Sequence, residues 1–330
     1  MQRFRAERQI LAGLQHPHIA RLLDGGVTDD GRPYLVMEYV AGQPLTTFCD
    51  ERRQPLVERL RLFRQVCAAI AYAHRNLVVH RDLKPGYILV TAEGEVKLLD
   101  FGIAKLLDAA ALAADAVLTR TGAWVLTPEY AAPEQMRGGA VTTATDVYGL
   151  GLVLYELLCG RPPFELGGRS WGEVERLVCE VEPLRPREAL QRAQRSDPTE
   201  RAGVAAVARA RGTDARRLAH ALRGDLDNIV LTALRKEPER RYASAAALAD
   251  DVARHLAGQP VAARGDAVRY RLGKFVQRPL GRGGRHDDRA AAGRLRADRH
   301  AAGARDRPRR WRSPTPRPRR RGWRRGRRSA

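Results

Sequence analysis

The sequence has little of what disulfide-linked, metal-clustered or membrane-spanning proteins need. Only 4 of its 330 residues are cysteine, and they form neither a CxxC pair nor a Cys/His spacing typical of a metal site. No run of about 18 or more apolar residues occurs, and no signal peptide opens the chain. We therefore expect buried thiols at Cys67 and Cys159, a reducing cytoplasm and no transmembrane segment in this chain.

Acidic residues are scarce relative to basic ones, and the imbalance is local. Lys and Arg number 59 against 38 Asp and Glu, a net charge of +21. Residues 279–330 hold 19 Arg and 4 Asp, so most of the surplus lies there. We expect this tail to be disordered, because it cannot bury enough apolar surface to offset its chain entropy. Its arginines, with Trp311 and Trp323, could bind nucleic acid, but a non-specific polycation is the simpler interpretation.

Before the tail, the chain has the patterns of a mixed α and β protein. Gly25-Gly26 is expected to end a first strand, and Asp30-Gly31 to form a hairpin turn. Residues 185–223, rich in Arg and Ala, are expected to form a solvated insertion with one or two helices. The expected helices are 4–15, 56–76, 147–159, 225–235 and 243–256, and the expected strands are 19–24, 34–40, 88–90 and 96–99.

The most informative motif is His-Arg-Asp-Leu-Lys-Pro at residues 80–85, followed by Asp-Phe-Gly at 100–102. Phosphoryl transfer needs a carboxylate that accepts the proton of the attacking hydroxyl and cations that screen the phosphates. These motifs closely resemble the catalytic loop and metal-binding turn of eukaryotic-type protein kinases. Residues 127–134 resemble the substrate-docking segment, and 146–151 the start of the large central helix. The chain over residues 1–258 therefore resembles a bacterial serine/threonine protein kinase.

The resemblance implies a role for each matching residue in the chemistry. Asp82 stands where the catalytic base would be, and Lys84 suits serine/threonine specificity. Thr127 would hydrogen-bond this pair. Asp100 would bind the Mg²⁺ that bridges the phosphates of ATP. The implied substrate is a protein with a Ser or Thr hydroxyl.

Further residues match the nucleotide site of that family. Met37 corresponds to the residue beside the hinge, and Glu38 to Val40 correspond to the hinge that grips adenine. Leu89 is expected to contact the nucleotide. Glu7 matches the glutamate of the regulatory helix, although a solvated charge is the alternative on composition alone.

Supporting and regulatory residues also follow from the resemblance. Arg241 would pair with Glu134, and Asp146 would clamp the backbone of the catalytic loop. A column that links the two lobes would contain Leu11, Leu22, His80 and Phe101.

Arg81, next to the catalytic aspartate, implies control by phosphorylation of the following loop. The candidate sites are Thr119 and Thr121, for which ordinary loop residues are the alternative.

The sequence departs from the family pattern in three places. Tyr87 replaces the asparagine that would bind a second Mg²⁺, and a phenol is a poor ligand for so hard a cation. No GxGxxG motif and no phosphate-gripping lysine precede Glu7. We expect the Arg-rich tail to be a frameshift product. We expect a truncated or mis-started gene model to explain the absence of the glycine-rich loop and the lysine at the front. A catalytically impaired kinase-like scaffold or fragment is therefore the alternative to an active kinase.

The fold that we predict is α+β and protein-kinase-like. Residues 1–40 would form an incomplete N-lobe and hinge, with a regulatory helix and short strands. Residues 41–258 would form a mainly α-helical C-lobe, followed by a linker at 259–278 and the tail at 279–330.

Overall fold

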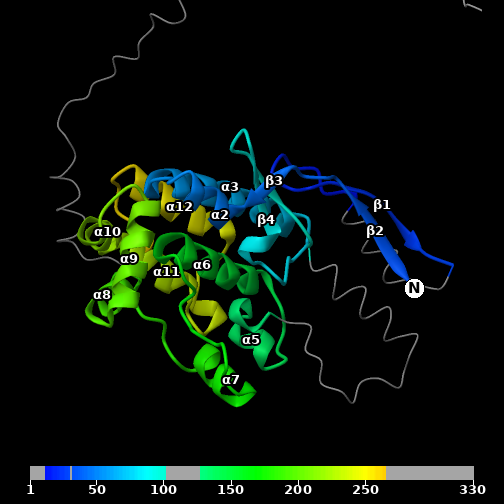
Figure 1. The fold of residues 1–330 in the computed structure, drawn as a ribbon. Helices are drawn as coiled ribbons and strands as arrows, with labels where there is room; N and C mark the ends of the chain where they lie inside the picture. The colour runs from blue at the N-terminus through cyan, green and yellow to red at the C-terminus, as the bar shows by residue number, and fades with distance from the viewer. Residues whose placement is uncertain (1–11, 30–31, 102–126, 265–330) are drawn as a thin grey trace, which may run out of the picture. The chain divides into compact units, whose positions relative to one another are not determined.

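The computed structural model describes residues 12–29, 32–101 and 127–264 (Figure 1). Most of the predicted helix at 4–15, most of the linker and the whole tail lie outside the described residues. Glu7, Leu11, Thr119 and Thr121 lie outside them as well.

A two-stranded antiparallel hairpin, β1 (Leu22–Val27) with β2 (Pro33–Met37), begins the described fold. The prediction that Gly25-Gly26 ends the first strand is wrong, since both glycines lie inside β1 and pair with β2. Gly26 faces Tyr34, and a Cβ at Gly26 would lie 2.8 Å from the Tyr34 hydroxyl. The missing side chain thus makes room for a cross-strand aromatic ring. β2 ends at Met37, earlier than predicted.

A second sheet has the strand order β3-β4-β5, with both pairs antiparallel. The strands are β3 (Gly42–Pro44), β4 (Ile88–Thr91) and β5 (Val96–Leu98). β4 and β5 confirm the predicted strands, whereas β3 was not predicted. Ile88 and Val90 are buried while Leu89, between them, is partly exposed, so one face of the sheet packs on the core.

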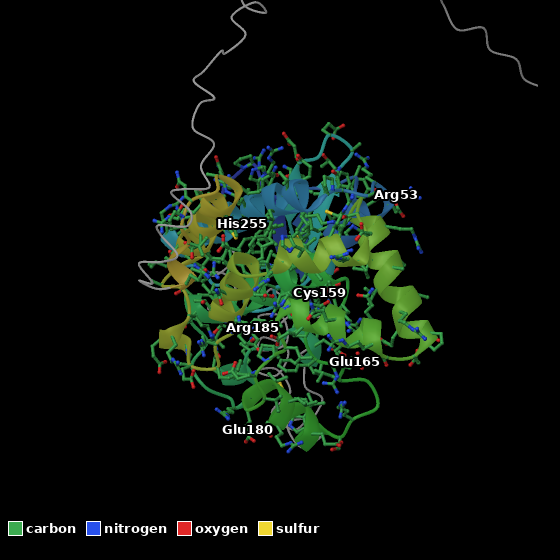
Figure 2. All side chains as sticks on the ribbon, turned by 90° about the vertical axis from the view of Figure 1, so that its left-hand side faces the viewer. Arg53, Cys159, Glu165, Glu180, Arg185 and His255 are labelled. Carbon is green, nitrogen blue, oxygen red and sulfur yellow. The ribbon has the colours of Figure 1, made fainter. Side chains whose placement is uncertain are left out.

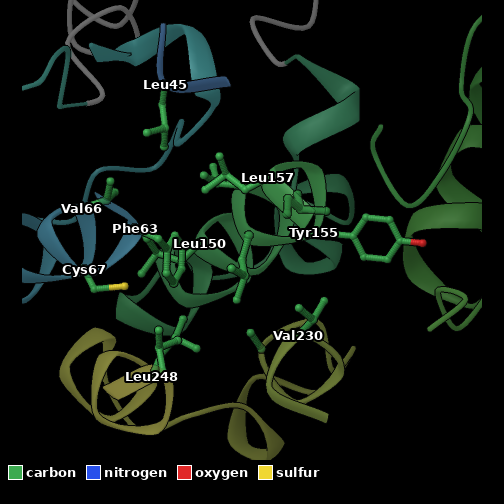
Figure 3. Close-up of a cluster of buried hydrophobic side chains, with 14 of the residues drawn as sticks. Leu45, Phe63, Val66, Cys67, Leu150, Tyr155, Leu157, Val230 and Leu248 are labelled. Atoms are coloured by element: carbon green, nitrogen blue, oxygen red, sulfur yellow. The ribbon is translucent and has the colours of Figure 1, made fainter. Parts of the chain in front are cut away.

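Most of the described chain is helical, and α6 (Thr143–Cys159) lies at its centre. Every residue of α6 from Thr145 to Cys159 except Glu156 is buried, as expected for a helix that is covered on all sides. The Thr142 hydroxyl accepts a hydrogen bond at its first turn, and Gly160, with φ of +72°, ends it in the left-handed conformation. Figure 3 shows Leu150 and Leu157 of α6 among buried side chains from neighbouring helices.

Helices before and after α6 cover it. Of these, α3 (Leu56–Arg75), α11 (Asp225–Ala233) and α12 (Ala245–Leu256) confirm predicted helices to within a few residues. The remaining short elements are α2 (Leu45–Glu51), α5 (Pro133–Met136), α7 (Trp171–Cys179) and the 3₁₀ turns η1 (Pro85–Tyr87), η2 (Pro128–Tyr130), η3 (Pro238–Arg240) and η4 (Ala262–Arg264).

The expectation of one or two solvated helices at 185–223 is wrong. This region forms three helices, α8 (Pro186–Arg195), α9 (Pro198–Ala210) and α10 (Ala215–Leu222). Their sparse leucines are buried in the main core, and Arg211 is 2% exposed. Alanine favours helix, and a few leucines at helical spacing suffice for an apolar face, which the abundant arginine obscures in the sequence.

All four cysteines are free and buried. Among the helices that the structure describes, none combines the length and apolar character needed to cross a membrane.

Candidate active site

The catalytic loop at residues 80–85 is held by one carboxylate of α6. Asp146, 1% exposed, accepts hydrogen bonds from the backbone N–H of His80 at 2.7 Å and of Arg81 at 2.9 Å. Arg81 has φ of +70°, a region that a side chain disfavours. The clamp thus fixes a strained backbone directly before Asp82, as the resemblance implied.

The side chains of Asp82, Lys84 and Thr127 come together. The Lys84 ammonium lies 3.1 Å from the Asp82 carboxylate and donates a hydrogen bond of 2.9 Å to the Thr127 hydroxyl. Burial opposes the charged ammonium, but the hydrogen bond and charge of Asp82 outweigh it and raise the pKa of Lys84. Lys84 therefore remains a cation next to a carboxylate that is still 22% exposed.

Asp100 follows β5 and also has a positive φ, +50°. Burial raises the pKa of the Asp100 carboxyl, and the negative charge of Asp82 adds to the rise, while His80 and Lys84 oppose it. A divalent cation would relieve both unfavourable effects, so this carboxylate fits a hard metal ion. The described residues contain no cluster of three or more His, Cys, Asp or Glu that could hold a metal.

The rings of His80 and Phe101 contact each other next to Asp100, with centroids 4.9 Å apart and planes tilted by 47°. Burial lowers the pKa of His80, although the negative charge of Asp146 opposes the effect. Its Nε2 lies 3.0 Å from the Leu99 carbonyl, which can only accept a hydrogen bond. The predicted contact between His80 and Phe101 is therefore present; Leu22 packs against the same core, and Leu11 is outside the described residues.

The segment at 127–134 is anchored at its end. Arg241 donates to both Glu134 carboxylate oxygens at 2.8 Å, and the Thr145 hydroxyl donates to the same carboxylate at 2.7 Å. Burial favours the neutral acid, but the Arg241 hydrogen bonds and charge outweigh it and lower the pKa of Glu134. Gln135 donates to the Arg81 carbonyl at 2.8 Å, so this anchor also contacts the catalytic loop.

Comparison with known proteins agrees with this geometry. Residues 1–252 match the family model of the protein kinase domain. The serine/threonine-protein kinase PknB of Mycobacterium leprae is 36% identical over 262 residues, 78% of this chain and 36% of that relative. This chain belongs to the serine/threonine protein kinase family. The predicted α+β kinase fold is thereby confirmed.

Two further relatives of the kinase are similarly distant. PknB of Mycobacterium tuberculosis (strain H37Rv) is 37% identical over 262 residues, 78% of this chain and 36% of the relative. PrkC of Bacillus subtilis is 35% identical over 254 residues, 76% of this chain and 33% of the relative. The chain spans about a third of the length of these curated relatives.

Tyr87 is where the kinase departs from its family pattern. Its backbone carbonyl accepts a hydrogen bond from Leu99 N–H at 2.8 Å, so the loop still joins the end of β5. The Lys84 ammonium lies 4.3 Å from the centre of the Tyr87 ring. The substituted side chain thus presents an aromatic face to Lys84.

The hinge of the kinase has a contact that sequence reasoning missed. Lys97 of β5 donates to the Glu38 carboxylate at 3.1 Å, and the Arg21 N–H donates to its other oxygen at 3.1 Å. The Arg21 hydrogen bond lowers the pKa of Glu38, and Lys97 adds to the effect. Leu89 lies opposite Lys97 in the sheet, so Leu89 shares a face of the sheet with the lysine that contacts Glu38.

The predicted nucleotide-contacting residues Met37 and Val40 are both partly buried around the end of β2.

A second missed contact is that of His74, whose Nε2 lies 2.7 Å from the Asp146 carboxylate. Nothing in the neighbours of His74 along the chain indicates a partner 72 residues away.

Proposed function

We propose that this kinase transfers the γ-phosphate of ATP to Ser or Thr hydroxyls of a protein substrate. The contact of Asp82, Lys84 and Thr127 next to Asp100 is the observation that carries the proposal. In this arrangement a substrate hydroxyl placed at Asp82 gives up its proton to the carboxylate as its oxygen bonds to the γ-phosphorus, whose bond to the β–γ bridging oxygen breaks and releases ADP. Lys84, kept cationic by Asp82, stabilises the negative charge that grows on the transferred group.

Thr127 and Asp146 act as positioning residues in this proposal. Thr127 fixes the Lys84 ammonium through its hydroxyl and belongs to the segment on which a substrate peptide would dock. Asp146 keeps the loop in its strained conformation, so that Asp82 needs no rearrangement during the reaction.

Mg²⁺ is the metal that we propose, with Asp100 as its ligand from this chain. Bound Mg²⁺ supplies positive charge that screens the phosphates. Met37, Glu38 and Val40 would surround the adenine from the hinge side, with Leu89 on the opposite face. We place the reaction in the cytoplasm, a proposal that the free cysteines support. We also propose that residues 40, 258 and 278 end the N-lobe with its hinge, the C-lobe and the linker. We propose Thr119 or Thr121 as a phosphorylation site.

A transfer assay tests this function directly. The full chain is incubated with radiolabelled ATP, Mg²⁺ and a general protein substrate, in parallel with Asp82→Asn, a variant of the same shape that cannot accept the proton. We expect labelled phosphoserine or phosphothreonine with the unchanged chain, reduced by about a hundredfold or more in the variant. Equal labelling by both chains would reject the proposal.

The position of Tyr87 supports a second candidate, a kinase-like scaffold that is impaired in transfer. Its ring contacts Lys84 at the position where the family pattern has a metal-binding asparagine. If impairment comes from this residue, Tyr87→Asn should increase transfer by about tenfold, because an amide oxygen suits Mg²⁺. Tyr87→Phe is the matched control, since it keeps the ring and restores no ligand. Equal rates in all three chains would reject this explanation.

A further inference from the structure

A cavity of about 860 Å³ lies between α8 and α10, and none of its lining residues belongs to the candidate active site. The two helices lie on the left in Figure 1, the side that faces the viewer in Figure 2. The charged residues of its wall are four arginines and one aspartate, which together carry a net charge of +3: Arg187, Arg216, Arg217, Arg223 and Asp214.

The positive charges of this cavity are only partly compensated. Arg217 lies 3.3 Å from Asp214, and both side chains are more than half exposed, so their pair is weak. Within the described part of the chain, Arg216 and Arg223 have no carboxylate partner and no side-chain hydrogen bond. Two full charges therefore face the cavity without a counter-charge.

Arg187, on the α8 side, is partly used. Its Nη2 lies 3.4 Å from Glu188, and its Nε lies 3.8 Å from Asp227, too far for a hydrogen bond. The Nε atom is buried and has no hydrogen-bond partner among the described residues. Arg187 therefore contributes its positive charge to the cavity wall, and its Nε is a donor without an acceptor in the part of the chain that the structure describes.

The rest of the wall indicates what kind of ligand fits. Gln191 and Gln194 add neutral amide donors, and Ala219 is the only apolar residue of the lining. An apolar ligand would gain little here, whereas phosphate oxygens accept bidentate hydrogen bonds from guanidinium groups. A single carboxylate would neutralise only one of the charges.

The cavity is also preformed, because its walls are fixed to the core. Leu190 of α8 and Leu218 and Leu222 of α10 are each no more than 1% exposed. The backbones that carry the arginines are therefore fixed, although the side chains of Arg216, Arg217 and Arg223 are themselves exposed.

We propose that the cavity between α8 and α10 binds a compact anion with two or more phosphate groups, either free in solution or as the headgroup of a lipid. Such an anion would offset the charges of Arg216 and Arg223 and accept hydrogen bonds from both helices. This binding function is separate from phosphoryl transfer, because it uses none of the proposed catalytic residues.

The measurement must report on the cavity separately from the rest of the chain, because the 19 arginines of residues 279–330 would bind any polyanion. Hydrogen–deuterium exchange of the full chain is followed by mass spectrometry while tripolyphosphate is titrated, and in parallel with phosphatidylcholine vesicles that contain cardiolipin, whose headgroup carries two phosphate groups. We expect slower exchange at 215–223 with at least one probe. Protection by tripolyphosphate assigns a free anion, and protection by the vesicles alone assigns a lipid headgroup.

Two paired variants distinguish binding in the cavity from a general effect of positive charge. Arg216→Ala/Arg223→Ala removes the two uncompensated charges and keeps a good helix former at position 216 of α10, while position 223 follows the helix directly. Arg201→Ala/Arg209→Ala removes two exposed arginines from α9, which do not line the cavity. We expect the first variant to need about tenfold more probe for the same protection, and the second to behave like the unchanged chain. No protection by either probe, or equal weakening in both variants, would overturn the proposal.

Discussion

Opposite charges lie at the two ends of α6, and the two charged side chains have different roles. At its first turn, Asp146 accepts backbone N–H groups of the catalytic loop. At its last turn, Arg211 donates to the carbonyls of Leu157 and Leu158, both at 2.8 Å. Both arrangements suit the helix dipole, which favours negative charge at the start and positive charge at the end. The first end holds strained backbone beside the active site, whereas the second fastens residues 185–223 to the core.

The difference teaches that burial alone does not separate function from stability. Asp146 and Arg211 are equally buried, at 1% and 2% exposed. The loop that Asp146 holds contains left-handed non-glycine backbone at Arg81, whereas the α6 carbonyls to which Arg211 donates belong to regular helix. The contacts that a buried charge makes, and whether they maintain strain, decide what its loss should change.

The largest effect should come from Asp146→Ala. This change leaves two backbone donors and His74 without their acceptor, so the loop relaxes and Asp82 moves. We expect phosphoryl transfer to fall by about a hundredfold or more, and the free energy of unfolding by about 2–5 kcal/mol. Steady-state kinetics and urea unfolding measure the two. A rate of phosphoryl transfer within about threefold of the original would contradict the proposed difference between Asp146 and Arg211.

At the other end, Arg211→Met should affect stability far more than rate. Burial, reinforced by the nearby charge of Arg59, lowers the pKa of Arg211 to about 10, so the side chain is still charged at neutral pH. Its removal leaves α6 carbonyls without donors and should lower the free energy of unfolding by about 2–4 kcal/mol. At temperatures where the variant stays folded, kcat should change little. Arg209→Met, exposed and two residues earlier, is the matched control.

The Glu134–Arg241 pair should have a smaller effect, which is a dependence of the folding stability on pH. The folded pKa of Glu134 is below its ordinary value of 4.5. Its stabilising contribution is therefore complete above the unfolded pKa and is lost as pH falls through the lower folded pKa. Thermal unfolding between about pH 5 and pH 2 should show a fall in Tm that Glu134→Gln reduces. An identical pH dependence in both chains would contradict this assignment.

The smallest effect should come from Lys97→Met, near the active-site end. The Lys97–Glu38 pair is partly exposed, so its loss should loosen the hinge only slightly. We expect KM for ATP to rise about threefold while kcat stays unchanged, since the catalytic loop is not touched. A fall in kcat of tenfold or more would place Lys97 closer to the chemistry than its contact with Glu38 implies.

What the sequence predicted well was local or carried by family motifs. The helix at 56–76 has a clear apolar period, and the contacts of Asp82, Lys84 and Thr127 follow from the resemblance. The missed contacts join residues far apart, such as His74 with Asp146 and Lys97 with Glu38, 72 and 59 residues apart. No local pattern marks such partners, because each side chain alone resembles a solvated charge.

Composition also misled the prediction in both directions. Two adjacent glycines suggested the end of a strand, yet β1 continues through them because the pairing with β2 and the Tyr34 ring favour small residues there. The Arg/Ala-rich stretch suggested solvation, yet Leu190, Leu218 and Leu222 are enough to bury one face of it. In both places tertiary contacts outweighed local propensity.

The attachment of Arg211 has a practical consequence for anyone who shortens this protein. Excising 185–223 to obtain a minimal catalytic unit would remove the donor of the last α6 carbonyls. It would also strip Arg59 of the Ala210 carbonyl to which it donates at 2.7 Å. A shortened version would need a replacement cation at the end of α6, or an apolar substitute for Arg59, to remain soluble and folded.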